Sequence, residues 1–349
     1  MRFGVEAPNC LAGMMYPVPF ANAEDVIRVA VEAEQLGYYD VGVNDHLSTQ
    51  KYVRDAWPEP PDYFEPLMTL SHVAAKTSVL RLTTGILVMP MRDPILLAKQ
   101  VATLDHLSNG RVILGAAVGG YRDEFETVAP KLKDASRADL TREGIEALRV
   151  LFEERNSTYQ GAYHQFENVE TFPKPVQKPL PIYSGGNVDA VIQRAGELCE
   201  GWLPAKIGVQ GIRAGKEKLD QYARAAGRDP SDISIALQSV VCLGDTDEQV
   251  RERFEASAFD LFRRSLAKTM MKDVSVDDYL DMNLIGTPDQ VCAKVAALEE
   301  AGVDHLCALL FVGNTVDEML HQIREFARHV LPAFPERGTR TVRSGRVAA

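Results

Sequence analysis

The sequence alternates short apolar runs with longer amphipathic segments, and this alternation constrains the fold more than any other feature. Strands that alternate with helices form a parallel sheet, because each crossover helix returns the chain to the same edge. Eight units in a chain of 349 residues favour a closed (β/α)₈ barrel over an open sheet. The eight runs with strand character are Phe3–Val5, Tyr39–Val43, Leu82–Val88, Val112–Leu114, Ile182–Ser184, Trp202–Leu203, Ile233–Leu243 and His305–Phe311.

An open, doubly wound sheet is the alternative arrangement of alternating strands and helices. Its dinucleotide-binding form carries a G-x-G-x-x-G turn after the first strand, and no such turn follows Phe3–Val5. We therefore expect one barrel domain over residues 1–335. Residues 157–181 contain four prolines and predict a hairpin plus an extended crossing outside the barrel. Residues 336–349 carry scattered arginines among small residues, which is typical of a disordered tail.

Single residues mark the ends of several helices. Asn22 precedes an amphipathic run and predicts an N-cap, because its side chain can accept a hydrogen bond from a free backbone N–H. Gly37 and Asn109–Gly110 follow two such runs and predict helix ends, since these residues readily adopt the left-handed conformation. Pro94 predicts the start of the helix that stops at Asn109.

The charge balance excludes two classes of partner. Lys and Arg total 38 and Asp and Glu total 49, which gives a net charge of -11. Nucleic acids and anionic membrane surfaces both require a basic face, so neither partner is expected. No apolar run is long enough to cross a bilayer, and the N-terminus shows no basic-then-apolar signal. We therefore expect a cytoplasmic protein that acts on a small molecule.

Cysteine and histidine show no metal-binding spacing. The seven histidines form no His-x-His or His-Glu-x-x-His pattern, and the cysteines form no C-x-x-C pair. Neither a disulfide framework nor a metal site is predicted, and the cysteines are interpreted as isolated reduced thiols. The five cysteines are Cys10, Cys199, Cys242, Cys292 and Cys307.

Reactive groups of a barrel lie at the carboxyl ends of its strands, and Asp45-His46 follows the second predicted strand. An imidazole there can donate a hydrogen bond to a cofactor or transfer a proton near neutral pH. The neighbouring carboxylate can anchor the loop or the ring, although adjacent side chains point in different directions. The alternative is purely structural, with His46 capping a loop and Asp45 starting a turn.

Glycines occupy two further strand ends. Thr84-Gly85 lies inside the third strand and predicts either a bulge that a ligand approaches or a strand glycine tolerated by packing. Gly119-Gly120, followed by Tyr121, either lets backbone approach a flat ring or forms a flexible turn. The acidic residues that come next, Asp123 and Glu124, could position or protonate a ligand, but we favour a solvated helix start.

Ser184-Gly185-Gly186 follows the fifth strand and precedes a helix. Bare backbone N–H groups at the positive end of a helix dipole are suited to bind a phosphate. The alternative is an ordinary strand-to-helix turn in which Asn187 is only the N-cap.

These segments, taken in order, resemble the luciferase-like monooxygenase family. The landmarks are Thr84–Val88, Ala102–Arg111, Leu114–Gly120, Glu124-Phe125, Phe172–Pro179, Ile182–Gly186 and Gly201–Pro204. The resemblance implies a barrel that binds reduced FMN or the deazaflavin coenzyme F420, with His46 near the ring. It also implies that Thr84-Gly85 forms the bulge that bends the ring, and that the phosphate lies near Gly185-Gly186.

Members of this family are oxidoreductases that act on small organic substrates. Some transfer hydride with F420, and others act as monooxygenases on paired donors with reduced FMN and oxygen; the Asn44-Asp45-His46 stretch favours the F420 branch. A homodimer is also implied. Two positions depart from the family pattern, because Tyr121 replaces a common Trp and Glu200 replaces the usual Asp before Gly201.

Two other classes of function remain open at this point. A cofactor-independent barrel hydrolase or lyase needs a metal cluster or a paired acid and base at the strand ends. The sequence shows no convincing set of that kind. The other class is a non-catalytic binding barrel that has lost its cofactor, and a binding titration with FMN and F420 distinguishes the alternatives.

Overall fold

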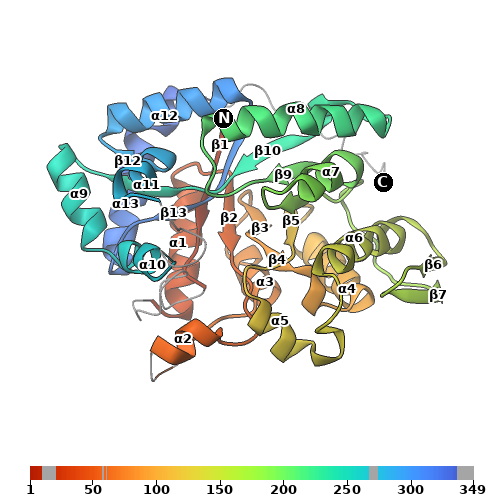
Figure 1. The fold of residues 1–349 in the computed structure, drawn as a ribbon. Coiled ribbons are helices and arrows are strands. Elements are labelled where there is room, and N and C mark those ends of the chain that lie inside the picture. Colours follow the sequence, from red (N-terminus) through yellow and green to blue (C-terminus); the bar gives the residue numbers. More distant parts are fainter. Residues whose placement is uncertain (10–20, 57–58, 60, 267–273, 336–349) are drawn as a thin grey trace.

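The computed structural model describes residues 1–9, 21–56, 59, 61–266 and 274–335, and it contains a closed parallel barrel with helices around it (Figure 1). Neighbouring barrel strands follow the order β1-β2-β3-β5-β8-β9-β10-β13, and β13 pairs with β1 to close the ring. These strands are β1 (Arg2–Glu6), β2 (Asp40–Val43), β3 (Arg81–Thr84), β5 (Val112–Ala117), β8 (Ile182–Gly185), β9 (Gly201–Leu203), β10 (Ser234–Leu237) and β13 (His305–Phe311). The predicted (β/α)₈ barrel is therefore confirmed.

The outer layer consists of helices whose apolar faces cover the strands. These helices are α1 (Ala23–Gln35), α3 (Pro66–Ala74), α4 (Pro94–Leu107), α6 (Arg137–Glu153), α7 (Asp189–Leu198), α8 (Val209–Ala225), α12 (Pro288–Ala301) and α13 (Val316–His329). Outward-facing strand residues such as Phe3 pack against this layer, and its ring centroid lies 5.6 Å from that of Phe326 on α13. Asn22 caps α1 through a capping box, as its position predicts, and Gly37 lies just beyond the helix with φ of 84°.

The third strand was predicted as one run over Leu82–Val88, and the structure divides it. It breaks into β3 and the short β4 (Leu87–Val88), and both pair with β5. Four steps lead from Thr83 to Leu87, whereas three lead from Ile113 to Ala116 on the partner strand. The extra residue is a β-bulge, so the bulge predicted around Thr84-Gly85 is present. The Gly85–Ile86 peptide bond within it is cis.

The seventh predicted strand, Ile233–Leu243, is also two strands. Only β10 belongs to the barrel, and β11 (Val240–Leu243) pairs with β12 (Leu284–Gly286) and with the end of β13. The chain divides because β13 is long enough to pair with β10 near its start and with β11 near its end. Between β11 and β12 lie α9 (Asp247–Glu255), α10 (Ala258–Leu266) and α11 (Val276–Met282).

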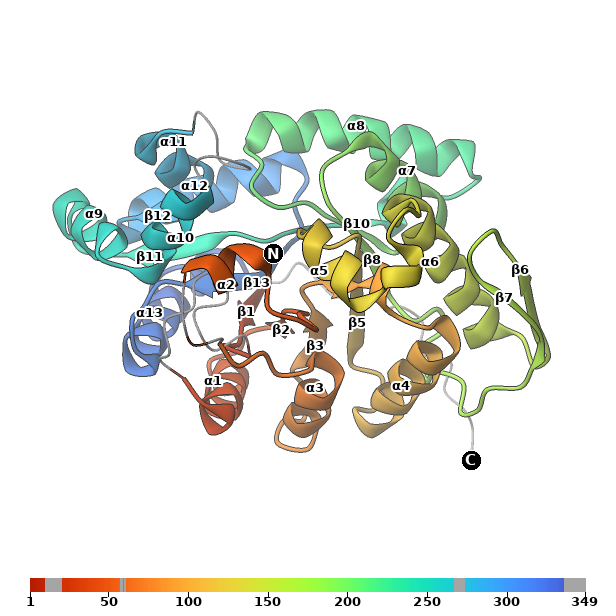
Figure 2. The same ribbon diagram turned by 60° about the horizontal axis from the view of Figure 1, so that its bottom comes forward.

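Shorter elements lie outside the ring of barrel strands. The predicted excursion contains an antiparallel hairpin of β6 (Ser157–Gln160) and β7 (Gln165–Val169). Two short helices, α2 (Lys51–Ala56) and α5 (Arg122–Val128), lie next to each other in front of the strands (Figure 2). The sequence predicted a helix start at Asp123 and Glu124 but no helix over α2. The predicted tail at 336–349 lies outside the described residues. Among the described residues, no helix combines the length and the apolar character needed to span a bilayer.

Candidate functional site

The segments predicted to carry function come together at one edge of the barrel. β2, β3, β5 and β8 are successive neighbours in a parallel sheet, so their carboxyl ends share the same rim. A Cβ on Gly185 would lie 3.0 Å from Cβ of Ala117 and 3.0 Å from Cγ2 of Ile86 in the bulge. His46 follows β2 on this rim, three strands from Gly185. At about 4.8 Å per strand, the candidate site spans ~15 Å.

The imidazole of His46 pairs with the carboxylate of Glu124 on α5. Its Nδ1 lies 3.0 Å from Glu124 Oε2, and only 3% of the Glu124 side chain is exposed. The other carboxylate oxygen accepts hydrogen bonds from the backbone N–H groups of Leu47 (2.8 Å) and Ser48 (3.2 Å). Gln50 Nε2 lies 2.6 Å from His46 Nδ1, and it donates to Glu124 Oε2 at 3.3 Å. One buried carboxylate thus holds both the ring and the loop behind it.

The protonation states at this pair follow from its surroundings. Burial alone raises the pKa of Glu124, but hydrogen bonds from His46, Gln50 and Leu47 outweigh it, so the pKa is below its ordinary value. The ionised carboxylate only accepts hydrogen bonds, and together with Gln50 Nε2 it occupies Nδ1 of His46. Nε2 has no hydrogen-bond partner among the described residues, and 16% of the His46 side chain is exposed. Nε2 is therefore the atom that can exchange a proton with a ligand.

Aromatic rings enclose one side of His46. The centroids of Tyr63 and Tyr121 lie 4.9 Å and 5.9 Å from that of the imidazole. Tyr121 stacks on Tyr52 at 5.3 Å, with 3.4 Å between the two hydroxyl oxygens. Burial, together with the neighbouring Tyr52, raises the pKa of Tyr121, which keeps its phenol neutral. Tyr121, the position that departs from the family pattern, therefore forms part of the wall beside His46.

Asp45 has partners of its own. Its Oδ2 accepts a hydrogen bond from the backbone N–H of Val88 at 2.8 Å, and its Oδ1 pairs with Arg92 at 2.6 Å. Arg92 also pairs with Glu65 at the start of α3. Burial raises the pKa of Asp45, and Arg92 partly offsets the rise. With both oxygens engaged, Asp45 fastens the loop after β2 to β4, and this geometry is that of a positioning residue for His46.

The predicted glycines line the space between β3, β5 and β8. A Cβ on Gly85 would lie 3.3 Å from both Glu6 Oε2 and Cβ of Ala308, so the bulge passes close over the barrel interior. Gly119 has φ of 76°, a left-handed conformation that favours glycine. A Cβ on Gly120 would meet no atom within 4 Å, so open space lies in front of that residue.

Only part of Ser184-Gly185-Gly186, the segment predicted to bind phosphate, has hydrogen-bonding groups left for a ligand. Ser184 Oγ accepts a hydrogen bond from Arg194 at 3.1 Å and donates to the Val191 carbonyl at 3.2 Å, so this hydroxyl is already used. Val188, rather than Asn187, is the N-cap of α7, and it provides no side-chain cap. The Asn187 side chain instead exchanges two hydrogen bonds with the backbone of Ala205, which corrects its predicted alternative role.

Arg194 and Trp202 complete the surroundings of this segment. Nη2 of Arg194 is buried and has no hydrogen-bond partner. The uncapped start of α7 and this guanidinium together leave positive charge unmatched near Gly185-Gly186. Trp202 is fully buried and donates to the Gly186 carbonyl at 2.8 Å, so it packs in the core rather than lining the rim.

Sequence reasoning missed the partners of His46. We expected Glu124 to start a solvated helix, yet it is buried beside the imidazole, and Gln50 and Tyr63 carried no recognisable signal. The only indication in the sequence was the Glu124-Phe125 landmark of the family resemblance. Phe125, the second residue of that landmark, is also fully buried.

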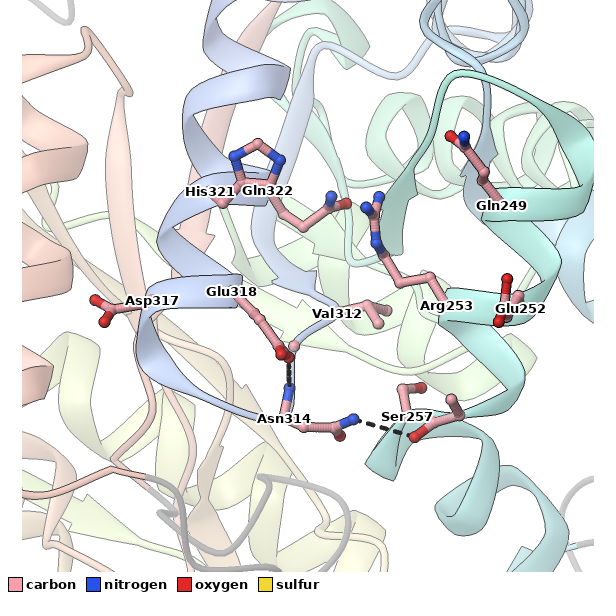
Figure 3. Close-up of a pocket in the computed structure, with 12 residues that line it drawn as sticks. Gln249, Glu252, Arg253, Ser257, Val312, Asn314, Asp317, Glu318, His321 and Gln322 are labelled. Atoms are coloured by element: carbon pink, nitrogen blue, oxygen red, sulfur yellow. Dashed lines mark hydrogen bonds between the residues drawn. The ribbon is translucent and has the colours of Figure 1, made fainter.

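A cavity lies away from these residues, between α9 and α13 at the end of β13 (Figure 3). Its volume is about 620 Å³. Three carboxylates line it, those of Glu252, Asp317 and Glu318, against one guanidinium, that of Arg253, and none of the predicted site residues does. Clustered carboxylates repel phosphate, so this cavity is a poor candidate for a phosphorylated cofactor.

Known proteins resemble this chain over most of its length. The family profile described as luciferase-like monooxygenase matches residues 1–305. The FMNH2-dependent dimethylsulfone monooxygenase of Pseudomonas fluorescens (strain Pf0-1) is 29% identical over 296 residues, which cover 77% of this chain and 78% of that protein. The F420-dependent glucose-6-phosphate dehydrogenase of Amycolatopsis mediterranei (strain U-32) is 26% identical over 326 residues, covering 88% and 93%. The crystal structure of monooxygenase RslO1 from Streptomyces bottropensis matches with a TM-score of 0.80 and 25% identity, covering 96% of this chain and all of that one.

Proposed function

Because the chain belongs to the luciferase-like monooxygenase family, we propose that it is an oxidoreductase that binds a reduced flavin-type cofactor, F420 or FMN, at the rim after β2, β3, β5 and β8. The observation that carries the proposal is the His46–Glu124 pair, which leaves Nε2 open on the rim that also carries the bulge and the two glycine turns. The residues fit such a cofactor, because small residues leave room for a flat ring and the start of α7 can receive a phosphate.

Between the two cofactors we favour F420 and a hydride-transfer reaction. When bound, F420 accepts a hydride from a substrate carbon or returns one to it. Oxidation of an alcohol also releases a proton, and His46 Nε2 accepts it as a general base. The Glu124 carboxylate stabilises the resulting imidazolium through Nδ1. The surrounding tyrosines shield one side of the ring from water.

The second candidate is an FMN-dependent monooxygenase that acts on paired donors with oxygen. It is favoured by the similarity to the dimethylsulfone monooxygenase and to RslO1. In that reaction the same His46 Nε2 donates or accepts a proton at the substrate. The substrate in either case is a small organic molecule whose identity would follow from the residues around His46.

A cofactor titration of the purified full chain separates these candidates. Oxidised and reduced forms of F420 and FMN are added in turn, and binding is followed by quenching of cofactor fluorescence or by calorimetry. We expect F420 to bind at least tenfold more tightly than FMN. Tighter binding of FMN would favour the monooxygenase over the F420-dependent reaction. Binding of neither cofactor would overturn both candidate functions.

We also propose that the protein forms a homodimer through the outer faces of α3 and α4. Met68 and Leu96 lie in the first turns of these neighbouring helices, and 70% and 59% of their surfaces are exposed. Large exposed apolar side chains on adjacent helices favour burial against a second copy. Light scattering should give twice the mass of one chain for the wild type and the mass of a single chain for Met68→Glu.

A further inference from the structure

Gln238 directly follows β10 and points into the mouth of the barrel. Ala236, two residues earlier, packs with Ala308 in an apolar cluster whose buried members all come from barrel strands. Ile235 and Leu237 belong instead to the larger core that includes the outer helices. Because alternate residues of a strand share a face, the side chain of Gln238 faces the barrel interior, one step nearer the rim than Ala236.

The backbone of Gln238 is held by the loop after β9. Its N–H donates to the Pro204 carbonyl at 3.3 Å, and the residue forms a parallel bridge with Ala205. The chain then leaves the barrel, because β11 pairs with β12 and with the end of β13. The division between β10 and β11 therefore makes Gln238 the last residue of this strand to face the mouth.

The amide of Gln238 reaches the opposite side of the barrel. β10 and β3 are four places apart in the closed ring of strands, so they lie across the mouth from each other. Gln238 Nε2 is nevertheless 3.9 Å from the position of a Cβ on Gly85, in the bulge that follows β3. The side chain therefore spans the mouth and ends beside the bulge that is expected to contact the cofactor ring.

This amide is available to a ligand. Gln238 is only partly buried, and its side chain makes no hydrogen bond with another of the described residues. A primary amide carries a carbonyl acceptor beside an NH₂ donor, and amides inside proteins normally use both groups. A ligand in the mouth can therefore receive a hydrogen bond from Gln238 and return one to it.

Glu6 of β1 is a second polar group at the same place. It is completely buried, and neither of its carboxyl oxygens has a hydrogen-bond partner in the protein. Its Oε2 lies 3.3 Å from the Cβ position of Gly85 and would overlap a Cβ on Gly42. Burial, together with the charge of Asp40, raises the pKa of Glu6 well above its ordinary value, so Glu6 is a neutral acid. An unpaired buried acid costs stability, which indicates a functional rather than a packing role for this layer.

From this arrangement we infer that the Gln238 amide hydrogen-bonds the ring of the flavin-type cofactor, at a ring edge where a carbonyl stands beside an N–H. The inference rests on the function proposed above. Such an imide edge is the complement of a primary amide, because each offers one donor next to one acceptor. Flavin and deazaflavin rings share this edge, so the contact is the same for FMN and F420. Glu6, as a neutral acid, adds no negative charge beneath the bulge.

The contact orients the ring as well as binding it. Packing against the glycines of the bulge leaves a flat ring free to rotate in its own plane, whereas two hydrogen bonds at one edge fix that rotation. A fixed ring presents the same atom to a substrate beside His46, and such orientation is a large part of what an enzyme supplies. We therefore expect loss of the amide to weaken cofactor binding and to lower kcat.

Titrations of the full chain with F420 and with FMN test the contact through affinity. The Kd is measured by quenching of cofactor fluorescence for the wild type, Gln238→Leu and Gln221→Leu. Leu is close to Gln in size but cannot hydrogen-bond, and Gln221 is the control because it is exposed on α8 of the outer layer. For the cofactor that the wild type binds more tightly, we expect Gln238→Leu to raise the Kd about tenfold and Gln221→Leu to change it less than about twofold.

A modified cofactor distinguishes a direct contact from a structural effect of the substitution. The derivative methylated at the imide nitrogen of the tighter-binding cofactor cannot donate a hydrogen bond to Gln238. Wild type should bind it about tenfold more weakly than the parent cofactor, and this penalty should shrink to about twofold in Gln238→Leu. Equal Kd values of wild type and Gln238→Leu for the parent cofactor would overturn the contact, and so would an undiminished methyl penalty in Gln238→Leu. Failure of the wild type to bind either cofactor would instead overturn the proposed function.

Discussion

Two of the carboxylate–imidazole pairs among the described residues have the same separation and different surroundings. His46 and Glu124 lie 3.0 Å apart at the rim, and His305 and Asp40 lie 3.0 Å apart in the barrel interior. The rim pair leaves one ring nitrogen open and part of the ring exposed, whereas the interior pair is completely buried. The two pairs have the same chemistry, so the access of a ligand to the imidazole is what distinguishes a proton-transfer site from a structural one.

The largest expected effect is at the rim. His46→Ala removes the atom proposed to exchange a proton, and loss of a general base typically reduces kcat by about 10²–10⁴-fold. The fold and the affinity for the cofactor should change little, because Glu124 keeps its two backbone donors. Steady-state kinetics and a cofactor titration measure the two quantities. Unchanged turnover would remove the assigned role of His46.

A substitution in the interior pair should lower the free energy of unfolding. Asp40→Ala removes the shared partner of His305 and Cys307, and removing one partner of a buried polar pair of this kind costs ~3–5 kcal/mol in the free energy of unfolding. Glu32→Ala is the control, since it breaks an exposed pair with Arg324 for which about 0–1 kcal/mol is expected. Urea denaturation compares the variants. Equal losses for both would show that burial of the interior pair contributes nothing.

Two glycine substitutions sharpen the contrast between interior and rim. Gly4→Ala forces the Asp40 carboxylate to move, and overpacking of this kind typically costs ~1–3 kcal/mol. Gly120→Ala adds a methyl group to open space at the rim, so we expect a change within about 0.5 kcal/mol. The same urea experiment applies. A larger loss from Gly120→Ala than from Gly4→Ala would reverse the assignment of packed interior and open rim.

The smallest expected effect is a pH dependence of stability at the rim. The folded pKa of Glu124 is below its ordinary value of 4.5, so its ionised form stabilises the fold above that pH. This contribution is lost as the pH falls through the lowered folded pKa. Wild type and Glu124→Gln should therefore differ most at neutral pH and converge in acid. Denaturation curves at pH 7 and about pH 3 would contradict the assignment if the difference grew on acidification.

Local patterns predicted much of the fold and the position of the rim. Strand and helix periodicity depends on residues a few positions apart, so the barrel and the N-cap at Asn22 could be derived from the sequence. The loop after a strand always emerges at the strand's carboxyl end, so His46 and Gly185-Gly186 were placed on one rim. The division of residues 233–243 into β10 and β11 was missed, because the partner strands that divide it lie far along the chain.

The sequence by itself therefore determined the alternation of strands and helices, the rim on which function is placed and the family of the chain. Only the tertiary structure decided which side chains face one another. Glu124 reaches His46 across 78 positions, and Asp40 reaches His305 across 265. The physical reason is that helix and strand hydrogen bonds follow local order, whereas convergence inside a barrel depends on how all eight strands close.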